Sequence, residues 1–358
     1  MPSLSAETIA NYLTRLAGAP VTVLRITPLN STASVKAYGY GTPLRIDYQS
    51  GSGAHVAVIH TIHPGAFGHE HMPDRARELL WEHRAFNRLP RHIRSLDVGG
   101  FAENGALEPL GKIEEFFLLT EYAEGREYAA DLGRIRDQGS ATPDDFARAD
   151  ALCDYLVGIH SRRGEDPALY LRRARELLGD AECIMGLVDS YPPDAAVSPE
   201  ILKQIEHLSV DWRWKLKTCA HRSRQVHGDF HPWNILFRPA DDFTVLDRSR
   251  GEFGDPADDV TCLSINYLFF SLQCSGRLEG PFEQLFLRFW NRYLEHTGDR
   301  EMLRVAAPFF AFRALVLASP VWYPKLDDPI RRTLARFMIA VLKADSFDPM
   351  LVNAYCAV

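Results

Sequence analysis

The sequence predicts an α+β fold of two units, one β-rich and N-terminal, the other mainly helical and C-terminal. Three observations support this prediction. Segments rich in strand-forming residues dominate the first third of the chain, helical patterns dominate the remainder, and Ala123-Glu124-Gly125 reads as a linker between them. We therefore expect domains at residues 1–122 and 123–358. A chain of 358 residues is long enough for two such units.

The N-terminal unit should begin with three strands. Residues 21–29 are β-rich, and residues 43–48 and 55–62 flank the sequence Gln-Ser-Gly-Ser-Gly at 49–53. Glycine and serine at that spacing are typical of a hairpin turn. A further strand is expected at residues 115–121, directly before the linker.

A helix should separate these strands. Pro73 suits its first turn, and residues 74–89 carry Leu79, Phe86 and Leu89 at helical spacing. Glu82 lies on the same apolar stripe, where a carboxylate needs a partner. The alternative is that Glu82 sits at the boundary of the stripe and reaches solvent.

The C-terminal unit should be helical apart from one hairpin. Thr142 can cap a helix that has Pro143 at its first position and Asp145 three residues on. The buried stripe of that helix would be Phe146, Ala149, Cys153 and Leu156. The hairpin would pair residues 235–237 with residues 243–246.

Composition excludes several classes of protein. Forty Lys and Arg against 47 Asp and Glu give a net charge of −7, which argues against a nucleic-acid binder. No apolar stretch reaches the roughly 20 residues that a membrane span requires, and no signal sequence is evident. The six cysteines are scattered and form no Cys-x-x-Cys pair, so we expect free thiols and a cytoplasmic protein.

The strongest local signal is the run His-Gly-Asp-Phe-His-Pro-Trp-Asn-Ile-Leu at residues 227–236. An aspartate followed five residues later by asparagine suits phosphoryl transfer, with Asp229 accepting the hydroxyl proton and Asn234 ligating Mg²⁺ beside the phosphates. The predicted hairpin returns Asp247 to Asn234, so two oxygen ligands converge. In the alternative reading, Asp229 and Asn234 only form turns and Asp247 only ends a strand.

This run, together with Leu246-Asp247 and the sequence Gly-Asp-Pro-Ala-Asp-Asp at 254–259, resembles the aminoglycoside phosphotransferase/choline kinase family of small-molecule phosphotransferases. The resemblance implies a protein-kinase-like fold with an N-terminal nucleotide-binding lobe and a C-terminal catalytic and substrate-binding lobe. It implies ATP and Mg²⁺ as cofactors and a small-molecule hydroxyl as acceptor. By the same resemblance Asp229 is the catalytic base, and Asn234 and Asp247 are the metal ligands.

The resemblance extends to residues outside this run. His227 resembles the histidine that structures the catalytic loop, and Asp259 the aspartate that holds its backbone. Residues 118–125 resemble the hinge, where Glu121 and Ala123 would offer backbone groups to adenine. Glu82 resembles the helix glutamate that pairs with a phosphate-binding lysine.

That lysine is missing from the third strand, where the most natural alignment places His60. Lys36, in the loop expected to cover the phosphates, is the first candidate to replace it, and an exposed strand lysine is the competing reading. His60 is the second, because a carboxylate neighbour such as Glu82 favours a protonated imidazole. Arg248 and Arg250, near the expected metal site, are further candidates for contact with phosphate.

A histidine cluster and a pair of tryptophans are two further candidates for a functional role. His60, His63, His69 and His71 fall within twelve residues, but a solvated loop is a better reading than a zinc site because Gly65, Gly68 and Pro64 interrupt them. In Trp212-Arg213-Trp214, packing of both tryptophans is a better reading than ligand stacking.

Two functions compete. The first is an ATP-dependent phosphotransferase acting on a small hydroxylated molecule. The second, motivated by the missing lysine, is a pseudokinase or nucleotide-binding regulatory protein. A protein kinase is disfavoured because few residues separate Asp247 from Gly254, which leaves no room for an ordinary activation segment.

Overall fold

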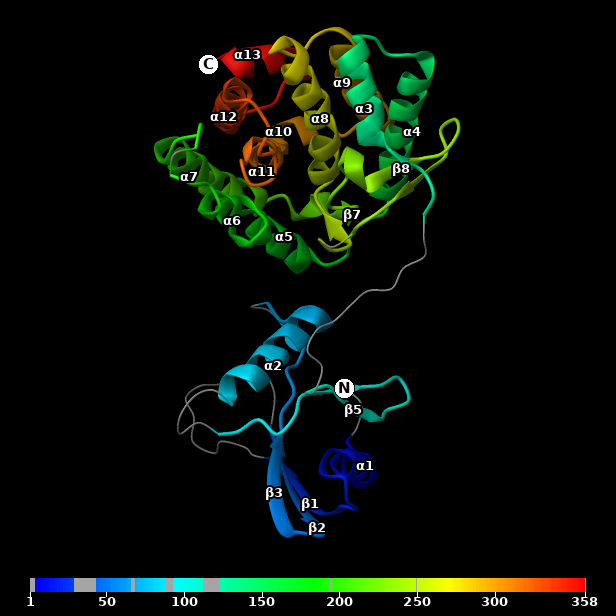
Figure 1. The fold of residues 1–358 in the computed structure, drawn as a ribbon, viewed down its shortest axis with the longest axis vertical. Coiled ribbons are helices and arrows are strands. Elements are labelled where there is room, and N and C mark those ends of the chain that lie inside the picture. The colour runs from blue at the N-terminus through cyan, green and yellow to red at the C-terminus, as the bar shows by residue number, and fades with distance from the viewer. Residues whose placement is uncertain are drawn as a thin grey trace. The chain divides into compact units, whose positions relative to one another are not determined.

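The computed structural model describes residues 4–28, 43–65, 68–87, 93–111, 123–193, 195–248 and 250–357. The chain divides into two units, Met1–Thr120 and Glu121–Val358 (Figure 1). Within the described residues, the first contains two small antiparallel sheets and two helices, and the second is mainly helical with short strands. The predicted α+β class is therefore confirmed.

In the N-terminal unit, β1 (Thr22–Pro28), β2 (Leu44–Ser50) and β3 (Gly53–Ile59) form an antiparallel sheet in that order. The predicted hairpin is confirmed, because Ser50 pairs with Gly53 across a two-residue turn. Gly53 has a φ of 119°, a conformation that side-chain-bearing residues rarely adopt. The third strand is shorter than expected: it ends at Ile59, so His60 follows the strand instead of lying on it.

Three elements of this unit were not predicted. Helix α1 (Ala6–Ala17) is capped at its start by the Ser5 hydroxyl and at its end by Gly18. Strand β4 (Gly99–Phe101) pairs with β5 (Leu107–Pro109). A small core joins α1, the sheet and β5 through Ile9, Leu13, Val21, Ile46 and Leu107. The helix predicted over residues 74–89 is α2 (Met72–Phe86). The predicted strand at 115–121 lies outside the described residues.

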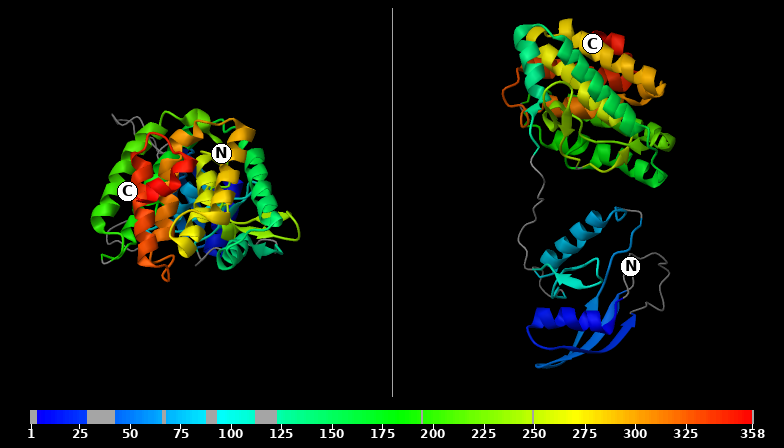
Figure 2. Two further views of the ribbon diagram at one scale, coloured as in Figure 1. Left: turned by 90° about the horizontal axis from the view of Figure 1, so that it is seen from above. Right: turned by 90° about the vertical axis from the view of Figure 1, so that its right-hand side faces the viewer.

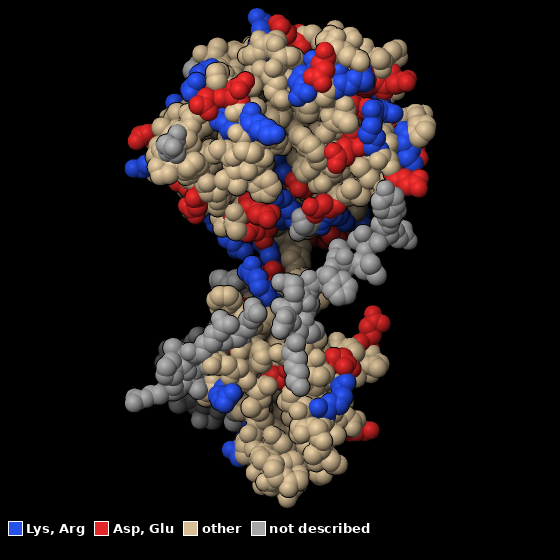
Figure 3. All heavy atoms as spheres, in the orientation of Figure 1, with Lys and Arg blue, Asp and Glu red and all other residues tan. Residues whose placement is uncertain are grey.

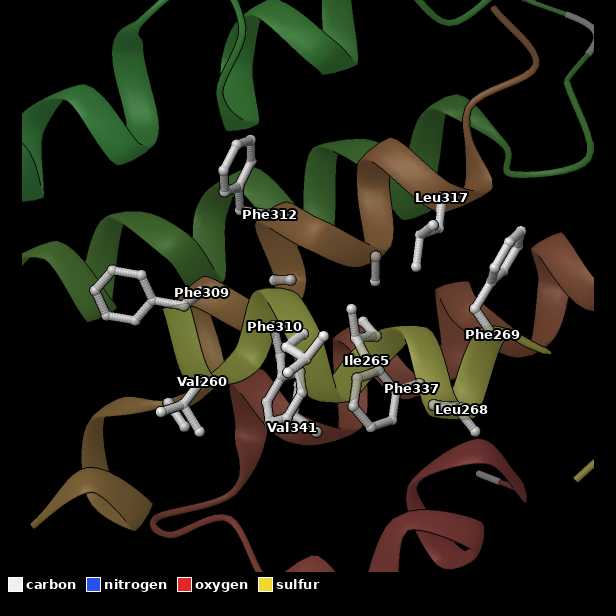
Figure 4. Packing of buried hydrophobic residues seen from close by; sticks show 14 of the residues in the cluster. Val260, Ile265, Leu268, Phe269, Phe309, Phe310, Phe312, Leu317, Phe337 and Val341 are labelled. Atoms are coloured by element: carbon white, nitrogen blue, oxygen red, sulfur yellow. The ribbon is translucent and has the colours of Figure 1, made fainter. Parts of the chain in front are cut away.

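The C-terminal unit is built around two helices that are buried on nearly all faces, α8 (Ala257–Ser275) and α11 (Ala307–Ala318). Figure 4 shows Ile265 of α8, Phe310 of α11 and Phe337 of α12 (Asp328–Lys343) close together in this core. An all-round apolar sequence is what a helix buried on every side requires.

The remaining helices pack side by side around this core (Figure 2). They are α3 (Tyr128–Gln138), α4 (Pro143–His160), α5 (Pro167–Gly179), α6 (Ile184–Asp189), α7 (Pro199–Leu216), α9 (Gly280–Thr297), α10 (Met302–Val305) and α13 (Val352–Ala357). The predicted cap of α4 is confirmed, since the Asp145 carboxylate accepts the Thr142 backbone N–H at 2.7 Å.

The predicted C-terminal hairpin is also confirmed. β8 (Ile235–Phe237) pairs with β9 (Phe243–Val245), with Ile235 opposite Val245, and β6 (Arg126–Glu127) adds a third strand beside β8. A second small ladder joins β7 (Arg224–Gln225) to β10 (Phe253–Gly254). The segment between β7 and β8 carries the conspicuous sequence run at 227–236, so both ends of that run are held by strands.

The tryptophan prediction is correct for one residue and wrong for the other. Trp212 is buried and its Nε1–H donates to the Leu342 carbonyl at 2.7 Å. Trp214 is 59% exposed, and the Lys217 ammonium lies 3.8 Å from the centroid of its ring. On a helix, residues two positions apart do not share a face, which is why the two rings separate.

The surface of the C-terminal unit carries no single dominant charge on the face drawn in Figure 3, where Lys and Arg alternate with Asp and Glu. Within the described residues, no helix combines the length and the apolar character that crossing a membrane requires.

Candidate active site

The loop between β7 and β8 is anchored from the first turn of α8. The Asp259 carboxylate is fully buried and accepts the backbone N–H groups of His227 and Gly228, each at 2.7 Å. Gly228 has a φ of 88°, and a Cβ there would come within 3.2 Å of the Arg250 side chain. The loop therefore requires both a carboxylate below it and a glycine within it.

A second contact fixes this carboxylate. The His160 imidazole, at the end of α4, places Nε2 at 3.1 Å from Asp259 Oδ2 and Nδ1 at 2.7 Å from the Tyr293 hydroxyl. Burial acts to raise the pKa of Asp259, but the hydrogen bonds from His160 and the two loop amides outweigh it and hold that pKa below its ordinary value. Asp259 is thus an ionised anchor for the loop.

Asp229 projects from the anchored loop and is mostly buried. The Asn234 side-chain amide donates to the Asp229 carbonyl at 3.1 Å, with its nitrogen 3.5 Å from Asp229 Oδ2. The His231 Nε2 atom lies 3.6 Å from the same oxygen. Asp229 and Asn234 are therefore in direct contact.

A buried arginine binds this aspartate, and the sequence alone did not predict it as part of the site. Arg313, on α11, donates through Nη1 to Asp229 Oδ1 and through Nη2 to the Gly228 carbonyl at 2.7 Å. The same Nη2 donates to Asp258 Oδ1 at 2.6 Å. In the sequence, the arginine inside an otherwise apolar helix indicates a buried ion pair, because a buried charge needs a partner.

These charges determine the protonation state of the aspartate. Burial acts to raise the pKa of Asp229, but the neighbouring Arg313, His231 and Arg250 outweigh it and hold that pKa below its ordinary value. Burial lowers the pKa of His231 despite the attraction of Asp229. At neutral pH the site therefore holds an ionised carboxylate beside a neutral imidazole.

The two arginines after Asp247 have different surroundings. Arg248 donates from Nε and Nη2 to the Val226 carbonyl at 3.1 and 3.0 Å, so it braces the loop, and the idea that it contacts phosphate receives no support. Arg250 lies beside the site, with Nε 3.9 Å from Asp229 Oδ1, while Nη1 donates to Cys183 Sγ at 3.4 Å and Nη2 lies 3.5 Å from Glu182 Oε2. That Nε is buried and has no hydrogen-bond partner in the part of the chain that the structure describes.

Asp247 follows β9 and lies next to Asn234. The Leu246 N–H donates to the Asn234 carbonyl at 2.8 Å, which extends the hairpin ladder to the residue before Asp247. Asp247 has a φ of 54°, a strained conformation for a residue with a side chain and one that clusters at functional sites. Its exposed carboxylate has no hydrogen bond or ion pair within the described ranges.

The donor set at this point fits a hard divalent cation. The Asn234 amide nitrogen is engaged by Asp229, which leaves the amide oxygen as the ligand, and Asp247 adds a carboxylate. Mg²⁺ typically takes one or two protein oxygens and completes its shell with water and phosphate oxygens. Within the described residues no three His, Cys, Asp or Glu side chains gather as a metal centre, the four N-terminal histidines included.

In the N-terminal unit, His60 and Glu82 meet. Nε2 of His60 lies 3.2 Å from Oε2 of Glu82 on α2, so the predicted neighbours are brought together. A parallel contact joins His69 to Glu78 at 2.6 Å. Lys36 and Glu121 lie outside the described residues, and Ala123 is half-buried at the start of the C-terminal unit.

Comparison with known proteins gives one family match. The model of the phosphotransferase enzyme family matches residues 51–302. A search of the curated proteins finds no match.

Solved structures similar to this chain include three kinases. An ethanolamine kinase from Plasmodium vivax is 15% identical, with 93% of this chain and 82% of that chain covered and a TM-score of 0.36. An amicoumacin kinase is 14% identical, with 91% of each chain covered and a TM-score of 0.41. A choline kinase from Streptococcus pneumoniae is 12% identical, with 94% of this chain and 98% of that chain covered and a TM-score of 0.34.

The family match spans more than two thirds of the chain and includes the anchored loop, the hairpin and the start of α8. The chain therefore has the predicted kinase-like fold class and belongs to the phosphotransferase enzyme family.

Proposed function

We propose that the protein transfers the γ-phosphoryl group of ATP to a hydroxyl of a small molecule. The observation that carries this proposal is the contact of Asp229 with Asn234 beside Asp247, on a loop held by the buried Asp259. A base, an amide ligand and a carboxylate ligand are the groups that this reaction requires in one place. Family membership supports the reaction class.

In the proposed reaction the acceptor oxygen bonds to the γ-phosphorus, the bond to the ADP oxygen breaks, and the hydroxyl proton passes to Asp229. Arg313 binds Oδ1, so Oδ2 is the oxygen that meets the hydroxyl. A carboxylate with a depressed pKa is a weak base, so Asp229 mainly orients the hydroxyl and takes its proton late in the transfer.

The remaining roles are those of ligands and cations. Asn234 and Asp247 would hold Mg²⁺, which supplies neutralisation of the phosphate charge when bound. Arg250, whose Nε lies 3.9 Å from Asp229 Oδ1, would add a positive charge beside the transferred phosphoryl group. In the N-terminal lobe, Lys36 or His60 would replace the missing phosphate-binding lysine, and Glu121 and Ala123 would offer backbone groups to adenine.

A second candidate, a nucleotide-binding protein without catalysis, is favoured by two observations. Arg313 already binds the Asp229 carboxylate, and β3 carries no lysine. Both features weaken a phosphotransferase site, because the base is partly neutralised and a phosphate cation is missing from its usual strand.

One experiment separates the two candidates. The full chain is assayed for ADP release with Mg·ATP over a panel of hydroxylated small molecules, and its thermal stabilisation by Mg·ATP is measured in parallel. The proposal expects acceptor-dependent ADP release that falls about 10²–10⁴-fold in Asp229→Asn, while nucleotide stabilisation is retained. Stabilisation without turnover, or normal turnover in Asp229→Asn, would reject this assignment.

A further inference from the structure

The three-stranded sheet of the N-terminal unit has one covered face and one open face. Helix α1 packs on the covered face, where Ile9 and Leu13 meet Ile46 in a small core (Figure 1). Successive residues of a strand point to opposite faces. Along β3, Val56 and Val58 point to the open face, where they are 55% and 53% exposed. The sheet therefore presents apolar surface to water on the side that α1 does not cover.

The strand register places charged side chains on this open face. Arg45 of β2 pairs with Val58, and Asp47 pairs with Val56. On the other side of β2, Arg25 of β1 pairs with Asp47. Directly paired residues of neighbouring strands point to the same side of a sheet. The open face thus combines two valines with two arginines and one carboxylate, so these charges leave one positive charge in excess.

The carboxylate of this face orients one of the two arginines. Asp47 Oδ1 accepts hydrogen bonds from Nε and Nη2 of Arg45, at 3.0 and 2.8 Å. The Nη1 group of Arg45 makes no hydrogen bond to any residue that the structure describes. A guanidinium that is already held in place loses less side-chain freedom when it binds an anion. Arg45 therefore offers an oriented cation with a free donor.

Arg45 also follows the segment that is expected to cover the phosphates. That segment, residues 29–43, joins β1 to β2 and contains Lys36, and Arg45 is the second residue of β2. The third strand carries no lysine. Unlike His60, whose charge requires protonation, an arginine is charged at any physiological pH, and its planar group matches the oxygens of a phosphate.

We propose that Arg45 contacts the phosphate groups of the nucleotide and supplies positive charge that β3 lacks, while Val56 and Val58 contact the nucleoside. This inference rests on the proposed function, because it takes ATP as the ligand of the N-terminal unit. It adds to Lys36 and His60 a cation on a described strand. An apolar surface with one oriented polar group beside it is the usual composition of a small-molecule site.

The test measures nucleotide binding to the full chain by calorimetric titration, without an acceptor. The probes are ATP and adenosine, which share the nucleoside and differ in the phosphates. Arg45→Ala should weaken ATP binding about tenfold and leave adenosine binding unchanged. Arg45→Lys, which keeps the charge, should recover part of the loss. Unchanged ATP binding in Arg45→Ala, or an equal loss for adenosine, would overturn the inference.

Arg25→Ala is the matched control. It removes the same charge from the same face, but Arg25 lies on β1 and pairs with Asp47, one step along the ladder from the Arg45–Val58 pair. Because an exposed charge that makes no contact acts only through screened solvent, ATP binding should change about twofold or less. Equal losses in Arg25→Ala and Arg45→Ala would mean that only the net charge of the face matters, which would contradict a contact with Arg45.

The same measurements separate this inference from the proposed function. A loss specific to ATP in Arg45→Ala, in a chain that releases no ADP with any acceptor, would reject the proposed transfer and leave the role of Arg45 standing. Acceptor-dependent ADP release, with unchanged ATP binding in Arg45→Ala, would reject the role of Arg45 and leave the transfer standing. Failure of the native chain to bind ATP would overturn both.

Discussion

Replacement of Arg313 by methionine tests the most highly connected contact of the site. The guanidinium bridges three acceptors, the carboxylates of Asp229 and Asp258 and the Gly228 carbonyl, and it is almost fully buried. Methionine fills similar space but leaves two carboxylates without their cation. Removal of one partner from a buried ion pair typically costs about 3–5 kcal/mol.

That loss is measurable in the C-terminal unit by itself. Five of the six tryptophans lie there, so tryptophan fluorescence during thermal unfolding follows this unit. For a unit of this size, each kcal/mol shifts the melting temperature by about 2–4 °C, so Arg313→Met should melt roughly 6–20 °C lower. The double variant Arg313→Met/Asp258→Asn should recover part of the loss, because one uncompensated charge is removed as well.

The pH dependence of unfolding provides an internal control for the same variant. The pKa of Asp229 is depressed in the folded protein, so the stability that its ion pair contributes is present above the unfolded-state pKa and is lost as pH falls through the folded-state pKa. The difference between the native protein and Arg313→Met should therefore shrink below about pH 4. Equal unfolding midpoints at pH 7 would refute the reasoning, as would a difference that does not depend on pH.

Three further predictions concern the ligands and the anchor. Asp247→Ala should weaken Mg·ATP binding more than metal-free ATP binding in calorimetric titrations, and equal losses would argue against a metal-ligand role. Lys36→Ala should raise KM for ATP and lower kcat with little dependence on pH. If protonated His60 is the phosphate cation instead, the activity of the native enzyme should fall between about pH 6 and 8. Unchanged kinetics in Lys36→Ala, together with native activity that does not vary with pH, would exclude both residues as the phosphate cation. Asp259→Asn should destabilise the C-terminal unit by about 1–3 kcal/mol in urea unfolding at pH 7, because two loop amides and His160 lose their anionic acceptor; since the pKa of Asp259 is depressed on folding, that difference should diminish as the pH is lowered below about 4, and a constant difference would count against the anchor role.

Elements with local signals could be predicted well. The turn at Gly51 and Ser52, the capped helix at Thr142 and the hairpin after Asn234 all depend on residues close together in the chain. Helix α1 also has local signals, since Ser5 caps its start and Gly18 follows its last residue. Cap residues at this spacing were sufficient to find it.

The residues of the candidate site divide in the same way. Asp229, Asn234 and Asp247 lie on one loop and one hairpin, so their proximity follows from short-range pairing of the strands between them. Asp259 and the His60–Glu82 pair needed the family resemblance as well, because nothing local shows which backbone groups or side chains these residues meet.

The sequence alone predicts the order of most elements and singles out the run at residues 227–236, and its match to the family model gives phosphotransfer as the reaction class. The packing of distant segments was needed to show that Arg313, 84 residues after Asp229, binds the Asp229 carboxylate. It also shows that Arg248 braces the loop while Arg250 lies beside Asp229. The physical reason is that hairpins and caps are fixed by neighbours in the chain, whereas the partner of a buried charge is fixed by which helices share a core. In this protein the packing of α11 against α8 makes that choice.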